Sequence, residues 1–381
     1  MGGTHTKGFD RVRDVFVEQI EAGEGVGSAV AVYHHGELVV DLWGGMADRA
    51  ASCPWQEDTI CVVYSTTKGA TATCLHMLVD RGQLSYDDLV VDHWPEFGKH
   101  GKDKITVRHV LTHQAGMPQH PPGYGDEEML DWAKMVEGME NLKPLWGPGE
   151  KTGYHAVNFG WLAGEIIHRV DGRTVGTFLA EEVCKPLGLN DLYIGLPESE
   201  EGRVAVLESI TDENAVKIET MLDTETIAGD DSERRMGDPV EFLNRPQAHR
   251  AELPAAGGLG SARDIAKLYA CLGAGGTLDG VTLMRPETIA AATKQQIYGL
   301  DAIINFPMSW ALGYMTGGQT SSSGPRLTAF GHAGFGGSNA FADPEIEMSF
   351  AYITNGISLD LLGYTRAFSL STAARQCAEA L

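Results

Sequence analysis

The chain has 381 residues, 43% of them hydrophobic, and carries a formal net charge of −23 at pH 7. Such a charge repels polyanions, so it argues against nucleic acids and anionic membrane surfaces as partners. A single hydrophobic core stops growing near roughly 250–300 residues, so a chain of this length predicts two lobes.

The ends of the chain and its cysteines indicate a cytoplasmic protein. Residues 1–7 lack the charged start and apolar stretch of a signal peptide. No apolar run approaches the ~20 residues that a membrane helix needs, so we expect no membrane partner. The six cysteines lie far apart without a Cys-x-x-Cys spacing, and we interpret them as reduced, mostly buried thiols in preference to a disulfide framework.

The predicted elements begin with an amphipathic helix over 9–22, where apolar residues recur at helical spacing. Two strand-like runs, 28–33 and 38–43, then flank a short turn that contains Gly36, which predicts a β-hairpin. The other end of the chain has three short strand-like runs and a closing helix. The strands cover 329–332, 338–342 and 348–353, and the helix runs from about 363 to 380.

The middle of the chain is richer in helical patterns, which proline and glycine clusters interrupt. The simplest arrangement is an α/β lobe built from both chain ends, 1–65 and 296–381, with a mainly helical lobe inserted over 66–295. Within that lobe, the polar and weakly periodic stretch near 200–246 predicts a surface loop, because irregular segments over ~15 residues are usually functional or disordered.

Ser65 and Lys68 are the first candidates for chemistry. A helix predicted over 71–80 follows them, so Ser65 lies at its start and Lys68 one turn later on the same face. A serine hydroxyl is a weak nucleophile that needs an adjacent base, and a desolvated lysine can give up its proton. The alternative is a helix-capping serine followed by an ordinary surface lysine.

Tyr154 is the candidate base, because it lies where the loop 149–158 runs into a helix predicted over 159–170. A tyrosine beside a cationic lysine has a lowered pKa and can act as a general base. The alternative is an ordinary tyrosine that packs against the helix.

The glycine-rich end of a predicted strand, 331–337, is a candidate oxyanion hole. Glycines in a strand let a ligand approach the backbone closely, and the N–H groups of Phe335 and Ser65 are the candidate donors. A simple glycine-rich turn is the alternative.

Two other motifs carry weaker signals. His109 and His113 lie four positions apart, as metal ligands on one helix do, but no acidic third ligand lies in register. We therefore favour a structural role at a helix end and predict no metal site. Ser338 lies in a string, 336–340, that approaches the Gly-x-Ser-x-Gly elbow of α/β-hydrolases but ends in alanine, so Ser65 is the stronger nucleophile.

Taken in order, these segments resemble the serine β-lactamase and penicillin-recognising superfamily, in its class C-like branch that holds the family VIII carboxylesterases. The segments 39–45, 109–118, 154–162 and 254–259 add to the likeness. The resemblance implies an α+β fold with an antiparallel sheet flanked by helices and an inserted mainly helical lobe. It also implies that Tyr154, assisted by Lys68, removes the proton of Ser65 as the hydroxyl attacks an acyl carbonyl, without a metal or organic cofactor.

Two departures from class C β-lactamases bear on the substrate. Ala156 stands where those enzymes have the asparagine of Tyr-x-Asn, and Asn158 follows two residues later. His332 and Gly334 stand where they have the lysine and glycine of Lys-Thr-Gly, and a histidine is largely neutral near pH 7. The resemblance makes His332, Gly334 and Asn158 the candidate substrate-binding residues, and both departures are typical of the esterase branch.

The leading interpretation is a serine hydrolase that cleaves small-molecule carboxylic esters through an acyl-enzyme on Ser65. One alternative is an acyltransferase that uses the same residues and passes the acyl group to an alcohol or amine. A β-lactamase or D-amino-acid peptidase, and a non-catalytic binding or scaffold protein that keeps the fold, are the others. The natural substrate and the oligomeric state stay open.

Overall fold

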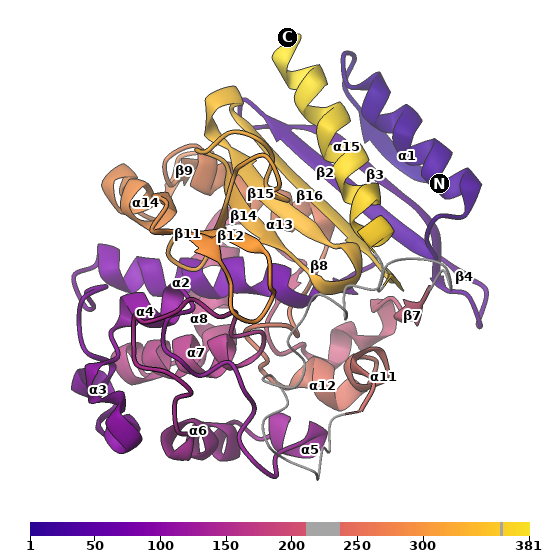
Figure 1. The fold of residues 1–381 in the computed structure, drawn as a ribbon. Coiled ribbons are helices and arrows are strands. Elements are labelled where there is room, and N and C mark those ends of the chain that lie inside the picture. Colours follow the sequence, from indigo (N-terminus) through magenta and orange to yellow (C-terminus); the bar gives the residue numbers. More distant parts are fainter. Residues whose placement is uncertain (211–236, 359–360) are drawn as a thin grey trace.

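The computed structural model describes residues 1–210, 237–358 and 361–381, with the side chains of 361–364 left out. Its upper part is one large antiparallel sheet with helices on both faces, and a mainly helical region lies below it (Figure 1). This arrangement is the antiparallel sheet flanked by helices that the resemblance implies.

Both ends of the chain build the ten-stranded sheet, in which neighbouring strands follow the order β1-β3-β2-β16-β15-β14-β13-β12-β11 and β4 pairs with β3. The N-terminal strands are β1 (Gly2–His5), β2 (Gly27–His34), β3 (Glu37–Asp48) and β4 (Cys53–Pro54). The C-terminal strands are β11 (Ile297–Leu300), β12 (Pro307–Trp310), β13 (Met315–Thr316), β14 (Phe330–Ala333), β15 (Asn339–Asp343) and β16 (Met348–Thr354).

The predicted hairpin and the three predicted C-terminal strands are confirmed. β2 pairs antiparallel with β3, and β14, β15 and β16 follow one another as an antiparallel meander. The two ends meet at β16, which pairs with β15 on one side and with β2 on the other, from Met348↔His34 to Thr354↔Ser28.

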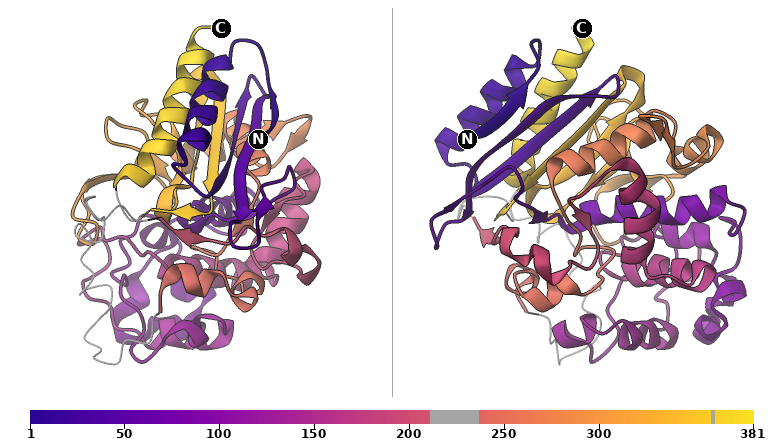
Figure 2. Two further views of the ribbon diagram at one scale, coloured as in Figure 1. Left: turned by 90° about the vertical axis from the view of Figure 1, so that its right-hand side faces the viewer. Right: turned by 180° about the vertical axis from the view of Figure 1, so that it is seen from behind.

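Helices from different parts of the chain cover the two faces of the sheet. Helices α1 (Asp10–Ala22) and α15 (Leu361–Glu379), both predicted, lie side by side on one face (Figure 2). Helix α13 (Ala262–Gly273) packs against β2, β15 and β16 on the other face. It falls within the range 66–295 that the sequence assigns to the helical lobe, so part of that range packs with the sheet.

Alternation along the central strands explains these two layers. In β2, Val30 and Val32 belong to the core beneath α1 and α15, whereas Ala29 and Ala31 face the core that α13 joins. Successive side chains of a strand point to opposite faces, so both faces are buried and small residues face α13.

The other helices and short strands surround the large sheet. The helices are α2 (Thr67–Asp80), α3 (Val90–His93), α4 (Val107–Leu111), α5 (Asp126–Met129), α6 (Trp132–Asn141), α7 (Asn158–Asp171), α8 (Val175–Phe178), α9 (Lys185–Leu187), α11 (Pro239–Leu243), α12 (Pro246–Arg250) and α14 (Pro286–Thr293). The short strands are β5 (Cys61–Val62), β6 (Leu192–Tyr193) and β8 (Leu259–Gly260) in one sheet, β7 (Glu208–Ser209) with β17 (Gly356–Ile357), and β9 (Thr277–Leu278) with β10 (Val281–Thr282).

The stretch near 200–246 differs from the predicted surface loop where it is described. A 3-10 helix (Glu198–Arg203), β7 and α11 occupy its two ends, while 211–236 lies outside the described residues. The sequence does not predict these short elements, because a weak polar pattern does not reveal pairing with strands far away along the chain.

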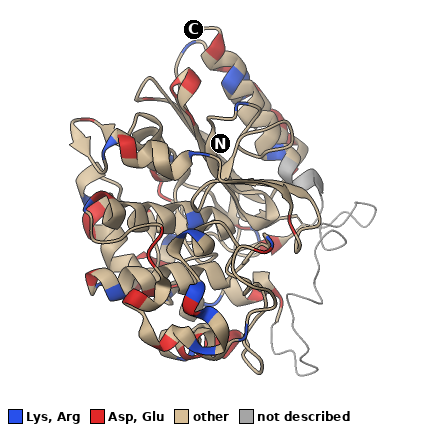
Figure 3. Ribbon diagram, turned by 60° about the vertical axis from the view of Figure 1, so that its left-hand side comes forward, with Lys and Arg blue, Asp and Glu red and all other residues tan. Residues whose placement is uncertain are grey.

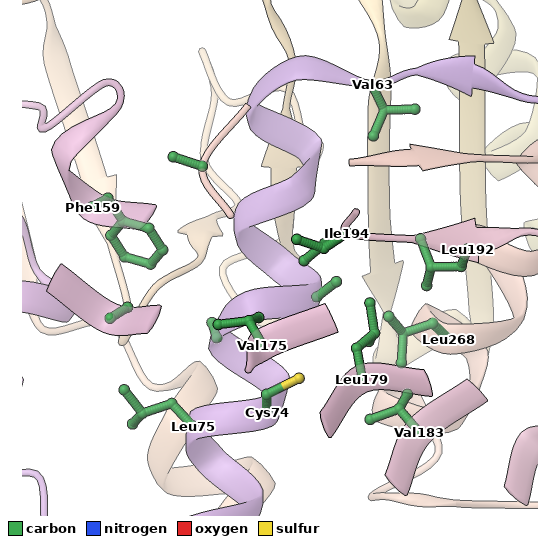
Figure 4. Packing of buried hydrophobic residues seen from close by; sticks show 14 of the residues in the cluster. Val63, Cys74, Leu75, Phe159, Val175, Leu179, Val183, Leu192, Ile194 and Leu268 are labelled. Atoms are coloured by element: carbon green, nitrogen blue, oxygen red, sulfur yellow. The ribbon is translucent and has the colours of Figure 1, made fainter. Parts of the chain in front are cut away.

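Helix α2 runs through the interior. Every residue from Thr67 to Leu78 is buried, which is typical of a helix enclosed by protein on all sides. Figure 4 shows Cys74 and Leu75 among the apolar side chains of Phe159, Val175 and Leu179. The segment that starts with Ser65 is therefore anchored in a rigid core.

Acidic and basic segments are interspersed along the outer helices of the ribbon in Figure 3, while a few charged residues such as Lys68, Lys102 and Asp301 are buried. All six cysteines are free and five are buried, as predicted. Within the described ranges, no helix is both long and apolar enough to cross a membrane.

Candidate active site

Ser65 lies in a one-turn 3-10 helix, Tyr64–Thr66, between β5 and α2. Tyr64 has a φ of 46°, a left-handed conformation that residues other than glycine rarely adopt. Thr67 stabilises this turn, since its hydroxyl donates to the carbonyl of Tyr64 at 2.5 Å. The resulting bend puts Ser65 on the wall of a large cavity, and strained backbone of this kind concentrates at functional sites.

Lys68 lies one helical turn beyond Ser65, and its ammonium group is fully buried. Its Nζ donates to Ser65 Oγ at 3.0 Å, to the carbonyl of Ala156 at 2.6 Å and to the carbonyl of Ala255 at 3.0 Å. All three partners are uncharged, so no carboxylate offsets the cost of burying the cation. Burial therefore lowers the pKa of Lys68 well below its ordinary value, which makes proton loss from this ammonium easier.

The loop 254–259 holds the lysine from the opposite side. Ala255 accepts a hydrogen bond from Lys68, and Pro254 accepts one from the hydroxyl of Thr71 at 2.7 Å. The N–H of Gly258 donates to Thr67 Oγ1 at 2.9 Å, and a Cβ at this position would lie only 2.6 Å from that oxygen. The glycine thus allows the loop to approach the start of α2 closely.

Tyr154 completes a contact triad, because its Oη lies 2.8 Å from Ser65 Oγ. The Lys68 Nζ lies 4.9 Å from the centre of its ring. The ring stacks on Trp310 with the planes 8° apart and makes a T-shaped contact with His113. These contacts fix the direction of the phenol, so the structure brings together the three residues predicted as catalytic.

Asp301 fixes the backbone of Tyr154, and sequence reasoning missed it. This fully buried carboxylate accepts hydrogen bonds at one oxygen from the N–H groups of Tyr154 at 3.0 Å, Ile303 at 2.9 Å and Ile304 at 3.0 Å. One signal exists in the sequence: Asp301 is a lone acid within the apolar run 300–304. Such an acid must be hydrogen-bonded if buried, but the sequence does not name its partners.

We expect Asp301→Ala to lower kcat by about 10- to 100-fold with KM little changed, because displacing a reacting group by ~1 Å costs up to about 10² in rate. Asp301→Asn keeps a carbonyl oxygen and is expected to recover most of the loss. Steady-state kinetics on one ester with both variants tests this. If Asp301→Ala lowered Tm but left kcat unchanged, the residue would serve stability alone.

The turn after β14 carries Phe335 to the same cavity. Phe335 begins a 3-10 turn, Phe335–Gly337, and both Phe335 and Ser65 line the cavity. Two buried hydrogen bonds join this turn region to the Ser65 turn: Ser338 Oγ donates to the carbonyl of Val63 at 2.8 Å, and Thr66 Oγ1 donates to the carbonyl of His332 at 3.3 Å. Ser338 is thus a buried structural hydroxyl, which agrees with the preference for Ser65.

The three candidate substrate-binding residues do not occur among the residues that line the cavity. Asn158 is fully buried, and its amide donates to the carbonyls of Met117 at 2.8 Å and Gln119 at 2.6 Å. His332 is also fully buried, donates from Nδ1 to the carbonyl of Ala333 at 2.7 Å, and lies beside the Tyr154 ring. Gly334 is packed so closely that a Cβ would lie 2.3 Å from the carbonyl of Val63.

The paired histidines make hydrogen bonds within the protein. His109 Nδ1 accepts from the N–H of Thr106 in a capping box at the start of α4. His113 Nδ1 accepts from the N–H of His155 at 3.2 Å. No group of three or more potential metal ligands occurs among the residues that the structure describes.

The cavity in front of Ser65 has a volume of about 1440 Å³. Aromatic and aliphatic side chains dominate its wall, and neither lysine nor arginine occurs among the described lining residues. His332, the counterpart of the class C lysine, is held neutral because burial lowers its pKa to about 3. The described part of the lining therefore offers a ligand carboxylate no lysine or arginine.

Comparisons with known proteins agree with this geometry. The Beta-lactamase family model matches residues 12–362. The Esterase/beta-lactamase LipL of Mycobacterium tuberculosis is 36% identical over 337 residues, which cover 86% of this chain and 77% of that protein. A family VIII carboxylesterase superposes with a TM-score of 0.90 at 37% identity, and a penicillin-binding protein homologue from Caulobacter crescentus with 0.88 at 39%; each covers 99% of both chains. The extent of the family match and these identities show that the chain belongs to the beta-lactamase family.

Proposed function

We propose that this protein is a serine hydrolase that cleaves carboxylic esters through an acyl-enzyme on Ser65. One observation carries the proposal: Ser65 Oγ lies on the wall of a large cavity and contacts both Tyr154 Oη, at 2.8 Å, and Lys68 Nζ, at 3.0 Å. The names of the relatives, an esterase/beta-lactamase and a carboxylesterase, support the same class of reaction.

In this mechanism Tyr154 Oη takes the proton of Ser65 as Oγ attacks the acyl carbon. The distance of 2.8 Å suits direct proton transfer, and Lys68, which lies 3.0 Å from Ser65 Oγ, assists this transfer. The N–H groups of Ser65 and Phe335 receive the negative oxygen of the tetrahedral intermediate. Collapse expels the alcohol, which takes the proton from Tyr154. Water then attacks the acyl-enzyme while Tyr154 takes a proton from this water. Tyr154 returns the proton to Ser65 Oγ as the acid leaves, which restores free Ser65.

A fluorophosphonate probe tests the nucleophile, since it forms a stable bond only with an activated serine. We expect one adduct, located at Ser65 by peptide mass spectrometry, and none in Ser65→Ala. Labelling elsewhere with Ser65 unmodified would overturn the assignment. A chromogenic ester panel run with and without added amine then separates hydrolysis from acyl transfer, because an acyltransferase forms the amide product in preference to the acid.

β-Lactams are expected to be poor substrates. Ala156 has no amide for a lactam side chain, and Asn158 already donates to Met117 and Gln119, so one contact worth about 1–3 kcal/mol is lost. The neutral His332 removes a charge-assisted hydrogen bond of roughly 1.5–3 kcal/mol to the lactam carboxylate. Together these losses lower lactam turnover by about 10² to 10⁴ relative to an ester that needs neither contact.

The measurement is kcat/KM for nitrocefin against a p-nitrophenyl ester with four or fewer acyl carbons. A nitrocefin value equal to or above that of the ester would restore the β-lactamase alternative.

The free cysteines support a cytoplasmic location, which is part of this proposal.

A further inference from the structure

The cavity that holds Ser65 is larger than a small ester requires. Its volume of about 1440 Å³ exceeds the roughly 300–1000 Å³ of ordinary small-molecule sites. Its walls come from two parts of the molecule: Trp161 and Phe242 belong to α7 and α11, whereas Met308 and Met315 belong to β12 and β13. An ester bound at Ser65 therefore has apolar surface within reach on both sides.

The mouth of the cavity is apolar as well. Tyr298 is 72% exposed, Leu327 66% and Phe368 58%, and all three line the cavity. Large apolar side chains at this level of exposure cost solubility, and grouped apolar exposure at a concave site is typical of a ligand-binding surface.

The described lining offers little charge to a ligand. Its one carboxylate, Asp126, already pairs with Arg245 at 3.2 Å and accepts from the N–H of Gly237 at 3.2 Å. The Lys68 ammonium is sealed from the cavity and uses its three donors on Ser65 and two carbonyls. Within the described lining, a charged group on the substrate would lose water and find no lysine, arginine or unpaired carboxylate, which is unfavourable.

From these observations, and resting on the proposed esterase function, we propose that the preferred substrates are uncharged esters with a large apolar acyl or alcohol group, of about eight carbons or more. Each methylene that leaves water for the cavity wall contributes to binding in the transition state. The gain is about fourfold in kcat/KM per methylene while the group still fits.

A homologous series tests the proposal. We expect kcat/KM for p-nitrophenyl esters to rise from acetate to octanoate, or kcat/KM for butyrate esters to rise with the size of the alcohol; the series that rises identifies which group the cavity receives. A fall beyond butyrate in the acyl series, together with a fall in the alcohol series, would overturn it. Failure of the esterase proposal itself has a different signature, namely no turnover of any ester or full turnover by Ser65→Ala.

A charge-matched pair isolates the second part of the proposal. A p-nitrophenyl ester whose acyl chain ends in a carboxylate is compared with the methyl ester of the same chain. We expect kcat/KM at least tenfold lower for the carboxylate. Equal or better turnover of the carboxylate would show a cationic subsite and contradict an uncharged substrate class.

Two variants locate the effect in the cavity. Met308→Trp adds bulk to the lining and is expected to lower the octanoate-to-acetate ratio of kcat/KM by at least tenfold. Leu300→Trp adds bulk on the paired strand β11 outside the lining, and is expected to leave that ratio unchanged. Phe368→Ala, at an exposed position of the mouth, is expected to lower the ratio severalfold and does not depend on repacking a core. Unchanged ratios in both cavity variants would overturn the proposal.

Discussion

Replacing Ser65 by alanine is expected to abolish ester hydrolysis and to leave the fold intact. The change removes only the Oγ that Tyr154 and Lys68 contact, and removal of a covalent nucleophile usually costs several orders of magnitude in rate. Ser338 does not replace it, because its Oγ is buried and donates to Val63. Turnover of a p-nitrophenyl ester and a circular dichroism melt measure both parts of this expectation.

Ser338→Ala is the matched control for Ser65→Ala. It removes a hydroxyl of the same kind that bonds the two turns together, so a loss of stability of about 1 kcal/mol is expected with the nucleophile still present. If Ser65→Ala kept more than about a tenth of wild-type turnover, the assignment of the nucleophile would fail.

The second large effect concerns the proton partners. Lys68→Ala and Tyr154→Phe are each expected to be nearly as damaging as Ser65→Ala, because both groups serve one proton transfer at Ser65 Oγ. Their combination is expected to add little to either single loss. A double variant whose loss equals the product of the single losses would show that the two groups act independently.

Thermal stability must be measured together with these rates, because Tyr154→Phe and Lys68→Ala have different effects on the buried groups around them. Tyr154→Phe keeps the ring that stacks on Trp310 and removes only the hydroxyl. Lys68→Ala leaves the carbonyls of Ala156 and Ala255 without their donor, and a buried acceptor left unsatisfied costs about 1–3 kcal/mol. Rates of Lys68→Ala are therefore compared at a temperature well below its melt.

The sequence predicts those parts of the fold that local pattern controls. Strand-like runs and their turns predict the β2–β3 hairpin and the last three strands, and helical patterns predict α1, α2, α7 and α15. It does not predict β1, whose Gly2 and Gly3 have no strand propensity and which pairs only through backbone with β3. Nor does it predict that α13 covers the sheet, because that depends on partners far away along the chain.

The residues of the site also differ in how well the sequence predicts them. Ser65, Lys68 and Tyr154 are found because residue type, spacing and family likeness point to them together. The sequence does not predict the role of Asp301, because its partners are backbone N–H groups, which no sequence motif marks. Asn158 misleads for a related reason: an asparagine near the site satisfies backbone carbonyls within the core as readily as it binds a ligand.

The position of β16 has a consequence for synthesis of the chain on the ribosome. This strand lies between β2 and β15, yet it is made long after β2. During synthesis from the N-terminus, the edge of β2 that faces β16 therefore stays unpaired until this later segment arrives, and folding with such distant partners is slow. Nascent chains that stall before β16 are expected to lack the completed sheet that holds the turns around Ser65 and Phe335, and therefore to be inactive.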